Sequence, residues 1–227
     1  VLKEIYEDTF LGPVLGLKGG TLLYILYSLP RFSVDLDFDL LEECNKEKIL
    51  DRVGGILRKF GTVEQLTDKK HTLFALVNYE KGEQGLKIEI SKRNLGSRYE
   101  ITNYLGVPIQ TMVKEDIFAN KLTALLTRER HANRDIFDTW FMLNNNWDVN
   151  WDLVEEKNSV KRDQFIKKCI SLLEKWPIES VLEGMGELMD NKTKDWVKKN
   201  RNTANIKILA TLPNINRDMR KRLLSVC

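Results

Sequence analysis

The sequence is short of the residues that build disulfide frameworks and histidine metal sites. Its 227 residues include three cysteines and two histidines. Cys44, Cys169 and Cys227 are odd in number, far apart and without a CxxC pair, which argues against a disulfide-stapled fold and a zinc knuckle. Because His71 and His131 are the only histidines, the sequence also argues against a histidine-based metal site.

Long hydrophobic runs are missing too. No apolar stretch approaches the roughly 20 residues that a membrane helix needs. The opening "VLKEIYEDTF" lacks the charged-then-apolar layout of a signal peptide. Repeats and low-complexity segments are absent, and 42% apolar with 30% charged residues is an ordinary globular composition. We therefore expect a globular protein of the bacterial cytoplasm with no membrane partner.

Charge is distributed unevenly along the chain. The net charge is +3, but residues 191–227 contain ten Lys or Arg against two acids, a local balance of +8. The remaining residues therefore carry −5. A basic C-terminal segment on a slightly acidic body is typical of proteins that bind an anionic partner such as nucleic acid. The simpler alternative is a solvated helical face.

Hydrophobic periodicity predicts mixed structure first and helices afterwards. In the first half, "TLLYILYSL" predicts a helix stopped by Pro30, "SVDLDFDLL" a strand, and "KEKILDRVGGILRKFG" an amphipathic helix ending at Gly61. "HTLFALVNYE" and "GLKIEISKR" predict a hairpin around "KGEQG", and "GVPIQTM" a further strand. From Lys114 onward, "KEDIFANKLTALLTRE", "NRDIFDTWFMLNN" and "RDQFIKKCISLLEKW" predict helices. We expect an α+β domain over residues 1–113 and a helical domain over 114–227.

A glycine turn precedes the first predicted helix. Gly19 and Gly20 in "LKGGT" allow positive φ and close approach of a ligand. The free N–H groups and positive dipole end of a helix N-terminus suit a phosphate. Thr21 is placed to cap the helix or to bind a phosphate oxygen. A plain turn with a helix cap is the alternative interpretation.

Three aspartates alternate along the next strand, "RFSVDLDFDL". Asp35 and Asp37 share a face and lie about 7 Å apart along it. Their repulsion is unfavourable unless a cation lies between them, and Mg²⁺ prefers carboxylate and phosphate oxygens. Asp39 has the same parity but lies further along, so we expect it to be peripheral. The alternative is an edge strand whose polar face meets water.

Later acids and cations add to this pattern. Glu89 in "LKIEIS" is a candidate third carboxylate, or else a solvent-facing residue of a hairpin. Lys121 lies on a predicted helix and has the reach to contact a triphosphate, with Asp135 holding Lys121 or Arg134 in place. Asp135 and Asp138 are three apart and share a helix face. Surface ion pairs on packed helices are the alternative.

Together these residues resemble the two signatures of a known family. "LKGGTLLYILYSLPRFSVDLDFDL" resembles the first motif of the AbiEii-type nucleotidyltransferase toxins of type IV toxin–antitoxin systems, within the polymerase-β-like superfamily. "KLTALLTRERHANRDIFDTW" resembles the second, and the two motifs span Leu17 to Trp140. The matching positions are Gly19, Gly20, Thr21, Ser33, Asp35, Asp37 and Phe38, followed by Lys121, Arg134, Asp135 and Asp138. Many superfamily members have Asp as the third carboxylate, where the best position here has Glu89.

The resemblance implies a polymerase-β-like fold with a mixed sheet, a helical C-terminal domain, and a metal-dependent enzyme. It implies that the NTP phosphates are bound by Gly19, Gly20, Thr21 and Ser33. It implies that one or two Mg²⁺ ions are bound by Asp35, Asp37 and Glu89. The catalytic residues that it implies are Asp35, Asp37, Lys121 and Asp135. Lys121 would neutralise phosphate charge, and Asp135 would orient Lys121 or assist the acceptor hydroxyl.

The resemblance also implies an acceptor and a partner. The acceptor would be the 3′ end of tRNA, and the partner a cognate antitoxin. Two alternatives stay open from the residues alone. One is a nucleotidyltransferase that modifies a protein or a small molecule such as an antibiotic. The other is a non-catalytic nucleotide- or RNA-binding module.

Overall fold

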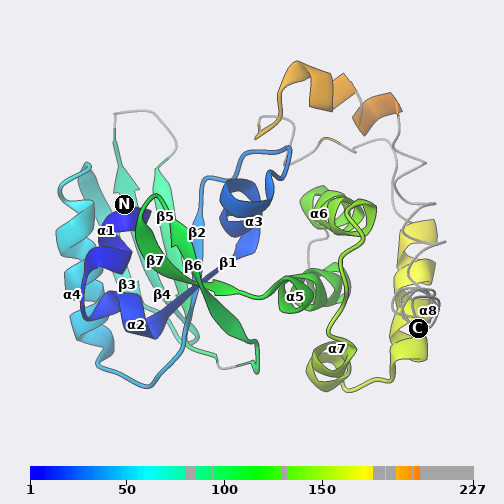
Figure 1. Ribbon diagram of the computed structural model, residues 1–227, viewed down its shortest axis with the longest axis horizontal. Coiled ribbons are helices and arrows are strands. Elements are labelled where there is room, and N and C mark those ends of the chain that lie inside the picture. The colour runs from blue at the N-terminus through cyan, green and yellow to red at the C-terminus, as the bar shows by residue number, and fades with distance from the viewer. Residues whose placement is uncertain are drawn as a thin grey trace. The chain divides into compact units, whose positions relative to one another are not determined.

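The computed structural model describes residues 1–79, 85–93, 95–128, 132–175, 182, 188–195 and 197–199 (Figure 1). The chain divides into two compact units, here called the sheet unit and the helical unit. The sheet unit contains Val1–Ser28 and Phe32–Val113, and the helical unit contains Leu29–Arg31 together with the chain from Lys114 onward. The three residues Leu29–Arg31 therefore belong to the helical unit, although the sheet unit precedes and follows them in the chain.

A seven-stranded sheet forms the centre of the sheet unit. Its strands are β1 (Leu15–Lys18), β2 (Leu36–Leu40), β3 (Thr62–Asp68), β4 (Thr72–Asn78), β5 (Leu86–Ser91), β6 (Tyr99–Tyr104) and β7 (Val107–Met112). Their order across the sheet is β3-β4-β5-β2-β1-β7-β6. The pairs β1–β7 and β2–β5 are parallel, and the other four pairs are antiparallel. The sheet is therefore mixed, which confirms the α+β fold class predicted from the sequence.

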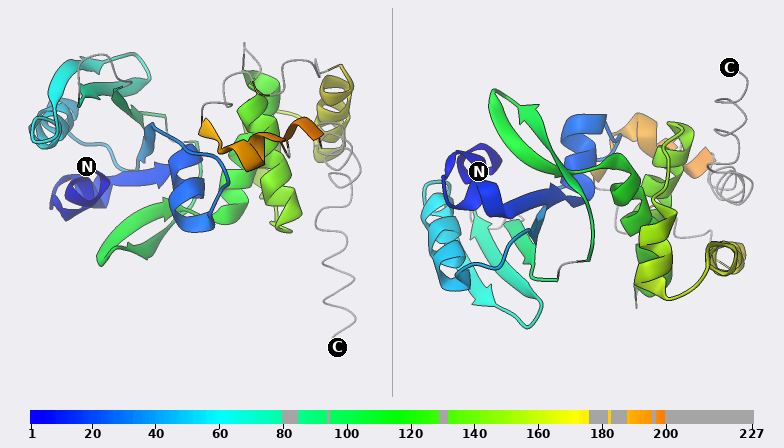
Figure 2. Two further views of the ribbon diagram at one scale, coloured as in Figure 1. Left: turned by 90° about the horizontal axis from the view of Figure 1, so that it is seen from above. Right: turned by 60° about the horizontal axis from the view of Figure 1, so that its bottom comes forward.

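The sheet has an apolar face and a polar face, because side chains alternate along each strand. Leu36 and Phe38 of β2 are buried, and their parity is opposite to that of Asp37. Helices α1 (Leu2–Glu7), α2 (Leu11–Val14) and α4 (Lys46–Leu57) lie on one side of the sheet (Figure 1, Figure 2). The Tyr6 ring of α1 lies 6.2 Å from the Phe38 ring, centroid to centroid. These helices therefore cover the apolar face and leave the polar face for chemistry.

Helix α4 begins after Asn45, whose side chain caps the helix N-terminus. The side chain of Asn45 accepts a backbone N–H of the first turn at 3.0 Å, which satisfies a donor that the helix leaves open. The helix continues through Gly54 and Gly55 and ends at Leu57, before the predicted end at Gly61. Interior glycines cost a helix about 0.5–1 kcal/mol each, so the buried apolar face of α4 outweighs them.

Hairpins between consecutive strands extend the sheet on both sides. The predicted pairing of β4 with β5 is confirmed, and it is antiparallel; its connecting residues 80–84 lie outside the described part of the chain. The β6–β7 hairpin was not predicted and turns through Leu105 (φ 51°) and Gly106 (φ 83°). Two consecutive positive φ angles are typical of a type I′ turn, whose twist matches that of antiparallel strands.

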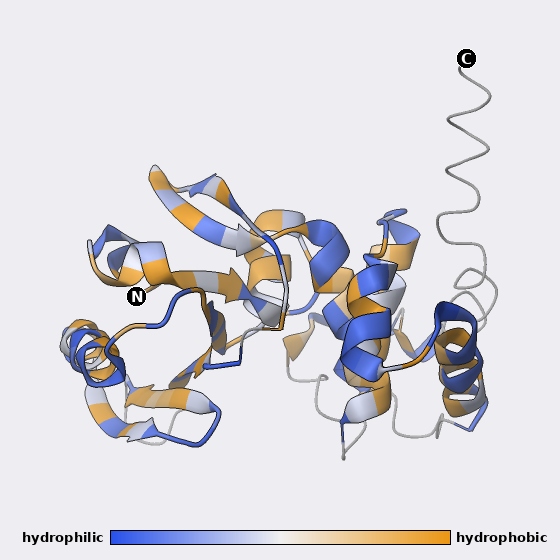
Figure 3. Cartoon of the chain, turned by 90° about the horizontal axis from the view of Figure 1, so that it is seen from below, coloured by the Kyte–Doolittle hydropathy of each residue, from blue (hydrophilic) through white to orange (hydrophobic). Residues whose placement is uncertain are grey.

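The helical unit contains α5 (Lys114–Thr127), α6 (Asn133–Asn144), α7 (Trp151–Asn158) and α8 (Arg162–Glu174). Helix α5 contacts each of the other three, and its Phe118 and Leu122 are fully buried. The predicted helices α5, α6 and α8 are confirmed, whereas the short α7 was not predicted. Hydrophobic and hydrophilic residues lie on different sides of α8 (Figure 3). Among the described residues, none of the helices has the length and apolar character to cross a bilayer.

Candidate active site

The glycine turn joins β1 directly to α3 (Gly19–Tyr27), whose first turn contains Gly19, Gly20 and Thr21. Gly19 has φ +79°, a conformation that L side chains rarely adopt. A Cβ at Gly19 would also lie 2.3 Å from Oδ2 of Asp37. The positive φ angle and the lack of room for a Cβ therefore both require glycine at position 19. The turn brings the start of α3, with its open N–H groups, against the Asp37 carboxylate.

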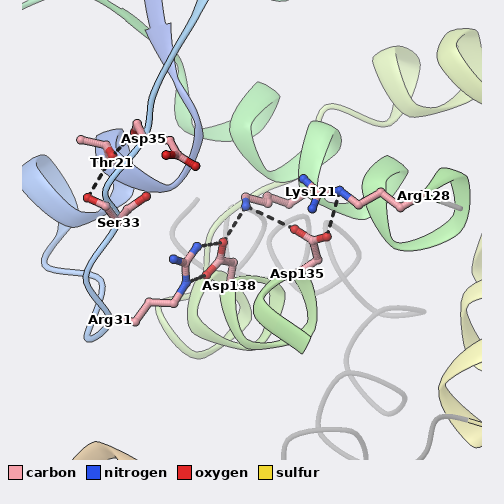
Figure 4. A network of polar contacts seen from close by, with 8 residues as sticks. All are labelled: Thr21, Arg31, Ser33, Asp35, Lys121, Arg128, Asp135 and Asp138. Atoms are coloured by element: carbon pink, nitrogen blue, oxygen red, sulfur yellow. Dashed lines mark hydrogen bonds and ion pairs between the residues drawn. The ribbon is translucent and has the colours of Figure 1, made fainter. Parts of the chain in front are cut away.

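Thr21 connects α3 to the segment that carries the aspartates. Its hydroxyl donates to the backbone oxygen of Asp35 at 2.5 Å and lies 3.4 Å from that of Ser33 (Figure 4). The N-cap of α3 is Lys18, and no side chain caps the helix. The prediction that Thr21 caps α3 is therefore wrong. The residue instead fixes the position of Ser33 and Asp35 relative to the glycine turn.

Strand register brings a third carboxylate to the aspartates. Asp37 of β2 is paired with Lys18 of β1 on one side and with Glu89 of β5 on the other. Paired residues on adjacent strands share a face and lie about 4.8 Å apart between the strands. Two acids directly opposite each other destabilise a sheet unless a cation separates them. The position of Glu89 therefore adds to the negative charge around Asp37.

Asp39 has a different environment from its neighbour two residues earlier. It is 7% exposed, its Oδ1 lies 2.5 Å from Lys18 Nζ, and its Oδ2 accepts the Tyr99 hydroxyl at 2.5 Å. Gly16 leaves room for Tyr99 to reach Asp39, because a Cβ at position 16 would lie 2.3 Å from the Tyr99 ring. The protein itself thus supplies a cation and a hydroxyl donor to the third aspartate of the motif.

The carboxylates of the sheet unit fit a magnesium ion that arrives with phosphates. Asp35 has no ion-pair partner among the residues that the structure describes, and Glu89 is exposed. Within those residues, no three carboxylate, imidazole or thiol groups form a ready-made metal cage. Mg²⁺ commonly uses one or two carboxylates and completes its shell with substrate phosphates and water. The carboxylate oxygens of the sheet unit, beside the N-terminus of α3, match this requirement of Mg²⁺.

The helical unit contains a buried network of charges (Figure 4). Asp138 on α6 is fully buried and accepts two hydrogen bonds from Arg31, at 2.7 Å from Nε and 2.6 Å from the terminal guanidinium nitrogen. Lys121 Nζ of α5 lies 2.6 Å from Oδ2 of the same carboxylate. Asp138 thus holds two cations at once, one of them through a bidentate pair.

Asp135 lies one helical turn before Asp138 and joins the same network. Its Oδ1 is 3.4 Å from Lys121 Nζ, and its Oδ2 is 3.2 Å from Arg128 Nε. The Arg128 contact has ion-pair distance without hydrogen-bond geometry, so Oδ2 lacks a hydrogen-bond donor among the described residues. Lys121 therefore lies between two aspartates that fix its ammonium group.

Electrostatics keep Asp138 charged despite its burial. Burial by itself would raise the pKa of this carboxyl group. The Lys121 charge, followed by the hydrogen bonds and charge of Arg31, outweighs that effect and lowers the pKa below its ordinary value. The sequence-based alternative of surface ion pairs is therefore wrong, because Arg31, Asp135 and Asp138 are at most 4% exposed.

Sequence reasoning missed Arg31. It lies in "LPRFS", four residues before Asp35, and its only signal was its place at the start of the aspartate motif. Of the two partners predicted for Asp135, Lys121 is confirmed, whereas Arg134 has no ion pair among the described residues. The second cation beside Asp135 is Arg128, which sequence reasoning also missed.

Two solved structures share this fold. A Helicobacter pylori protein named JHP933 matches with a TM-score of 0.63 and 24% identity, covering 99% of this chain and 91% of its own. A candidate nucleotidyltransferase from H. pylori matches with a TM-score of 0.63 and 24% identity over 97% of this chain and 92% of its own. At this identity the likeness establishes the fold. Comparison with curated proteins finds no significant match.

A family model provides the stronger comparison. The model described as nucleotidyl transferase AbiEii toxin, Type IV TA system, matches residues 1–210. That range contains both motifs and all the residues of the glycine turn, the strand carboxylates and the helical charge network. The chain belongs to the AbiEii family of nucleotidyltransferase toxins of type IV toxin–antitoxin systems.

Proposed function

We propose that this enzyme transfers a nucleotide from an NTP to the 3′ end of tRNA, in a Mg²⁺-dependent reaction, and that a cognate antitoxin counteracts it. The observation that carries the proposal is the contact between the glycine turn and the strand carboxylates. Gly19, at positive φ, faces the Asp37 carboxylate, and Glu89 is paired with Asp37 across the sheet. This arrangement suits a triphosphate that brings its metal ions with it.

The triphosphate binds at the start of α3. Gly19 and Gly20 place backbone N–H groups against its oxygens without a side chain between them. The Ser33 hydroxyl group is the side-chain donor proposed for the phosphates, and Thr21, whose hydroxyl donates to the Asp35 backbone oxygen, keeps Ser33 beside the turn. Asp35, Asp37 and Glu89 would hold the magnesium ions, whose charge would offset that of the phosphates.

The reaction forms a bond between the acceptor hydroxyl oxygen and the α-phosphorus. The bond from the α-phosphorus to the bridging oxygen breaks, pyrophosphate leaves and the hydroxyl proton passes to solvent. Lys121 stabilises the negative charge that accumulates on the phosphates. Asp135 and Asp138 keep its ammonium group in place, so Asp135 acts through Lys121. A preorganised cation of this kind needs no rearrangement during the reaction.

RNA is the proposed acceptor for two reasons. The family consists of toxins, and blocking tRNA acceptor ends stops translation. Residues 191–227 also carry a local charge of +8, which suits a phosphate backbone. Most of that segment lies outside the described residues, so its contribution rests on sequence alone.

The test is a transfer assay with each α-labelled NTP, Mg²⁺ and separate pools of RNA, protein and small molecules. We expect label at the 3′ end of RNA of tRNA length, and its loss in Asp37→Asn. Asp51→Asn is the matched control, since Asp51 is an exposed acid of α4 on the other side of the sheet. Label in protein or small molecules alone would refute the RNA acceptor. RNA binding without any NTP turnover would refute the enzyme and favour a binding module.

A further inference from the structure

An open cavity of about 620 Å³ lies within the helical unit. It is bordered by the end of α5, the end of α7 and one side of α8, and it is called the α8 groove here. Its principal lining residues are Leu126, Thr127, Phe165, Lys168, Leu172 and Lys175. The volume is within the range of functional binding sites in proteins.

The lining has one sign of charge. Among the described residues of the α8 groove, each charged side chain is a lysine: Lys157, Lys168 and Lys175. Lys157 donates to Asn120 of α5. Lys168 and Lys175 are exposed and have no carboxylate within ion-pair distance in the described part of the chain. Two unneutralised cations that face one cavity repel each other. An anionic ligand bound between them would reduce this repulsion.

The two lysines are arranged as a row. Lys168 and Lys175 are seven residues apart, which is two turns and about 10.5 Å along a helix axis. Ser171 and Leu172 lie between them, on the same side of α8. A lysine near a helix C-terminus is favourable by itself, which accounts for Lys175 without a ligand. Lys168 lies in the middle of α8, and that explanation does not apply to it.

The floor of the α8 groove is apolar. Phe165 is fully buried, and Leu126 and Leu172 are half-buried beside it. Single-stranded nucleic acid presents both chemistries that match this lining, since its phosphates suit lysines and its bases and sugars suit apolar surface. The hydroxyl groups of Thr127 and Ser171 add donors for sugar and phosphate oxygens.

We infer that the α8 groove binds the single-stranded backbone of the RNA acceptor through Lys168 and Lys175. This inference rests on the proposed RNA acceptor and assigns it a docking surface. Leu126 follows Lys121 by five residues, about 7.5 Å along the α5 axis, and a helix is about 10–12 Å wide. The α8 groove and Lys121 are thus separated by on the order of 15 Å, within the length of a short RNA strand.

The experiment measures binding of a fluorescent single-stranded RNA 12-mer ending in CCA, by anisotropy, over a range of salt concentrations. Lys168→Ala/Lys175→Ala is compared with Lys70→Ala/Lys167→Ala, which removes the same charge from exposed lysines outside the groove. We expect the slope of log K against log salt to fall by about 1.4 in the groove variant and to stay unchanged in the control. The weakening should be the same for unrelated RNA sequences.

A transfer assay separates this inference from the proposed function. In the groove variant, the KM for RNA should rise while kcat at saturating RNA stays within about twofold. If the wild type labels RNA and both variants keep the same KM and salt slope, the docking surface is refuted and the acceptor stands. If the wild type labels no RNA at all, the proposed acceptor fails first.

Preferential binding of an acidic peptide over RNA in the α8 groove would also overturn the inference, in favour of a protein partner. Thermal unfolding confirms that each variant is folded.

Discussion

The molecule contains two close pairs of aspartates, one in each unit, and they have opposite environments. Asp35 and Asp37 belong to the sheet unit and are partly exposed. Asp135 and Asp138 lie on α6 and are 1% and 0% exposed. The helical pair receives three cations from the protein, Arg31, Lys121 and Arg128. In the strand pair, Asp37 is paired with Lys18 of β1 on one side and with another acid, Glu89 of β5, on the other.

We interpret the helical pair as part of the folded scaffold and the strand pair as part of the proposed active site. Buried carboxylates persist only with cations and hydrogen bonds around them, so the helical pair is part of the folded structure and fixes Lys121. Carboxylates that face another acid at an open surface carry a cost that a metal ion would remove. Removing a strand aspartate should therefore affect chemistry alone, whereas removing a helical one should affect folding first.

The largest expected effect is on activity in the strand pair. Asp37→Asn should lower kcat for nucleotide transfer on the order of 10²–10³-fold, as the loss of a preorganised charged group does. Its free energy of unfolding in urea should change by less than about 1 kcal/mol, because Asp37 is partly exposed. A parallel loss of stability and activity would contradict the assignment of Asp37 to the site.

The next effect is on stability in the helical pair. Asp138→Asn leaves Arg31 and Lys121 buried without their shared carboxylate, which should cost about 3–5 kcal/mol of unfolding free energy. Urea denaturation measures it, with Asp152→Asn, an exposed acid of α7, as the matched control. A loss below about 1 kcal/mol would show that this ion pair is not part of the scaffold.

The sequence predicted the alternation within β2 better than the helical charge network, for a physical reason, although β2 begins at Leu36 and Asp35 precedes it. Period-two alternation in "SVDLDFDLL" indicates which residues share a face of a strand without any knowledge of the neighbours. The parity of Glu89 follows from the same rule. Its pairing with Asp37 depends on a parallel register between distant segments, and this cannot be read from local pattern.

The helical network depends on long-range contacts. Arg31 and Asp138 are 107 residues apart in sequence, and no periodicity connects them. The cap that was one of two predictions for Thr21 failed for a related reason: its place at a helix start favours a cap, but its hydroxyl donates to the backbone oxygen of Asp35 fourteen residues later. Helix α7 was missed because eight residues carry little periodic signal.

A pair of glycine substitutions tests whether the geometry of the strand site depends on the turn. Gly19→Ala places a Cβ 2.3 Å from Asp37 Oδ2 at φ +79°, so it should reduce transfer and cost about 1–2 kcal/mol of stability. Gly55→Ala, inside α4, meets nothing within 4 Å and should stabilise by about 0.5–1 kcal/mol. Equal effects in the two variants would show that the glycine turn has no special role.

The smallest effect expected is a pH dependence that belongs to the helical pair alone. The pKa of Asp138 is lowered in the folded state, so the unfolded chain binds its proton more readily. The stability that this carboxylate contributes is therefore complete above its unfolded pKa of about 3.9, and it is lost as the pH falls through the lower folded value. The difference in unfolding free energy between wild type and Asp138→Asn should be constant from about pH 5 to 7. It should then narrow towards pH 3, because protonated Asp138 resembles asparagine.

Urea titrations at several pH values measure this difference, with Asp152→Asn as the reference. A difference that stays constant down to pH 3 would mean that the charge of Asp138 does not hold Arg31 and Lys121 in place.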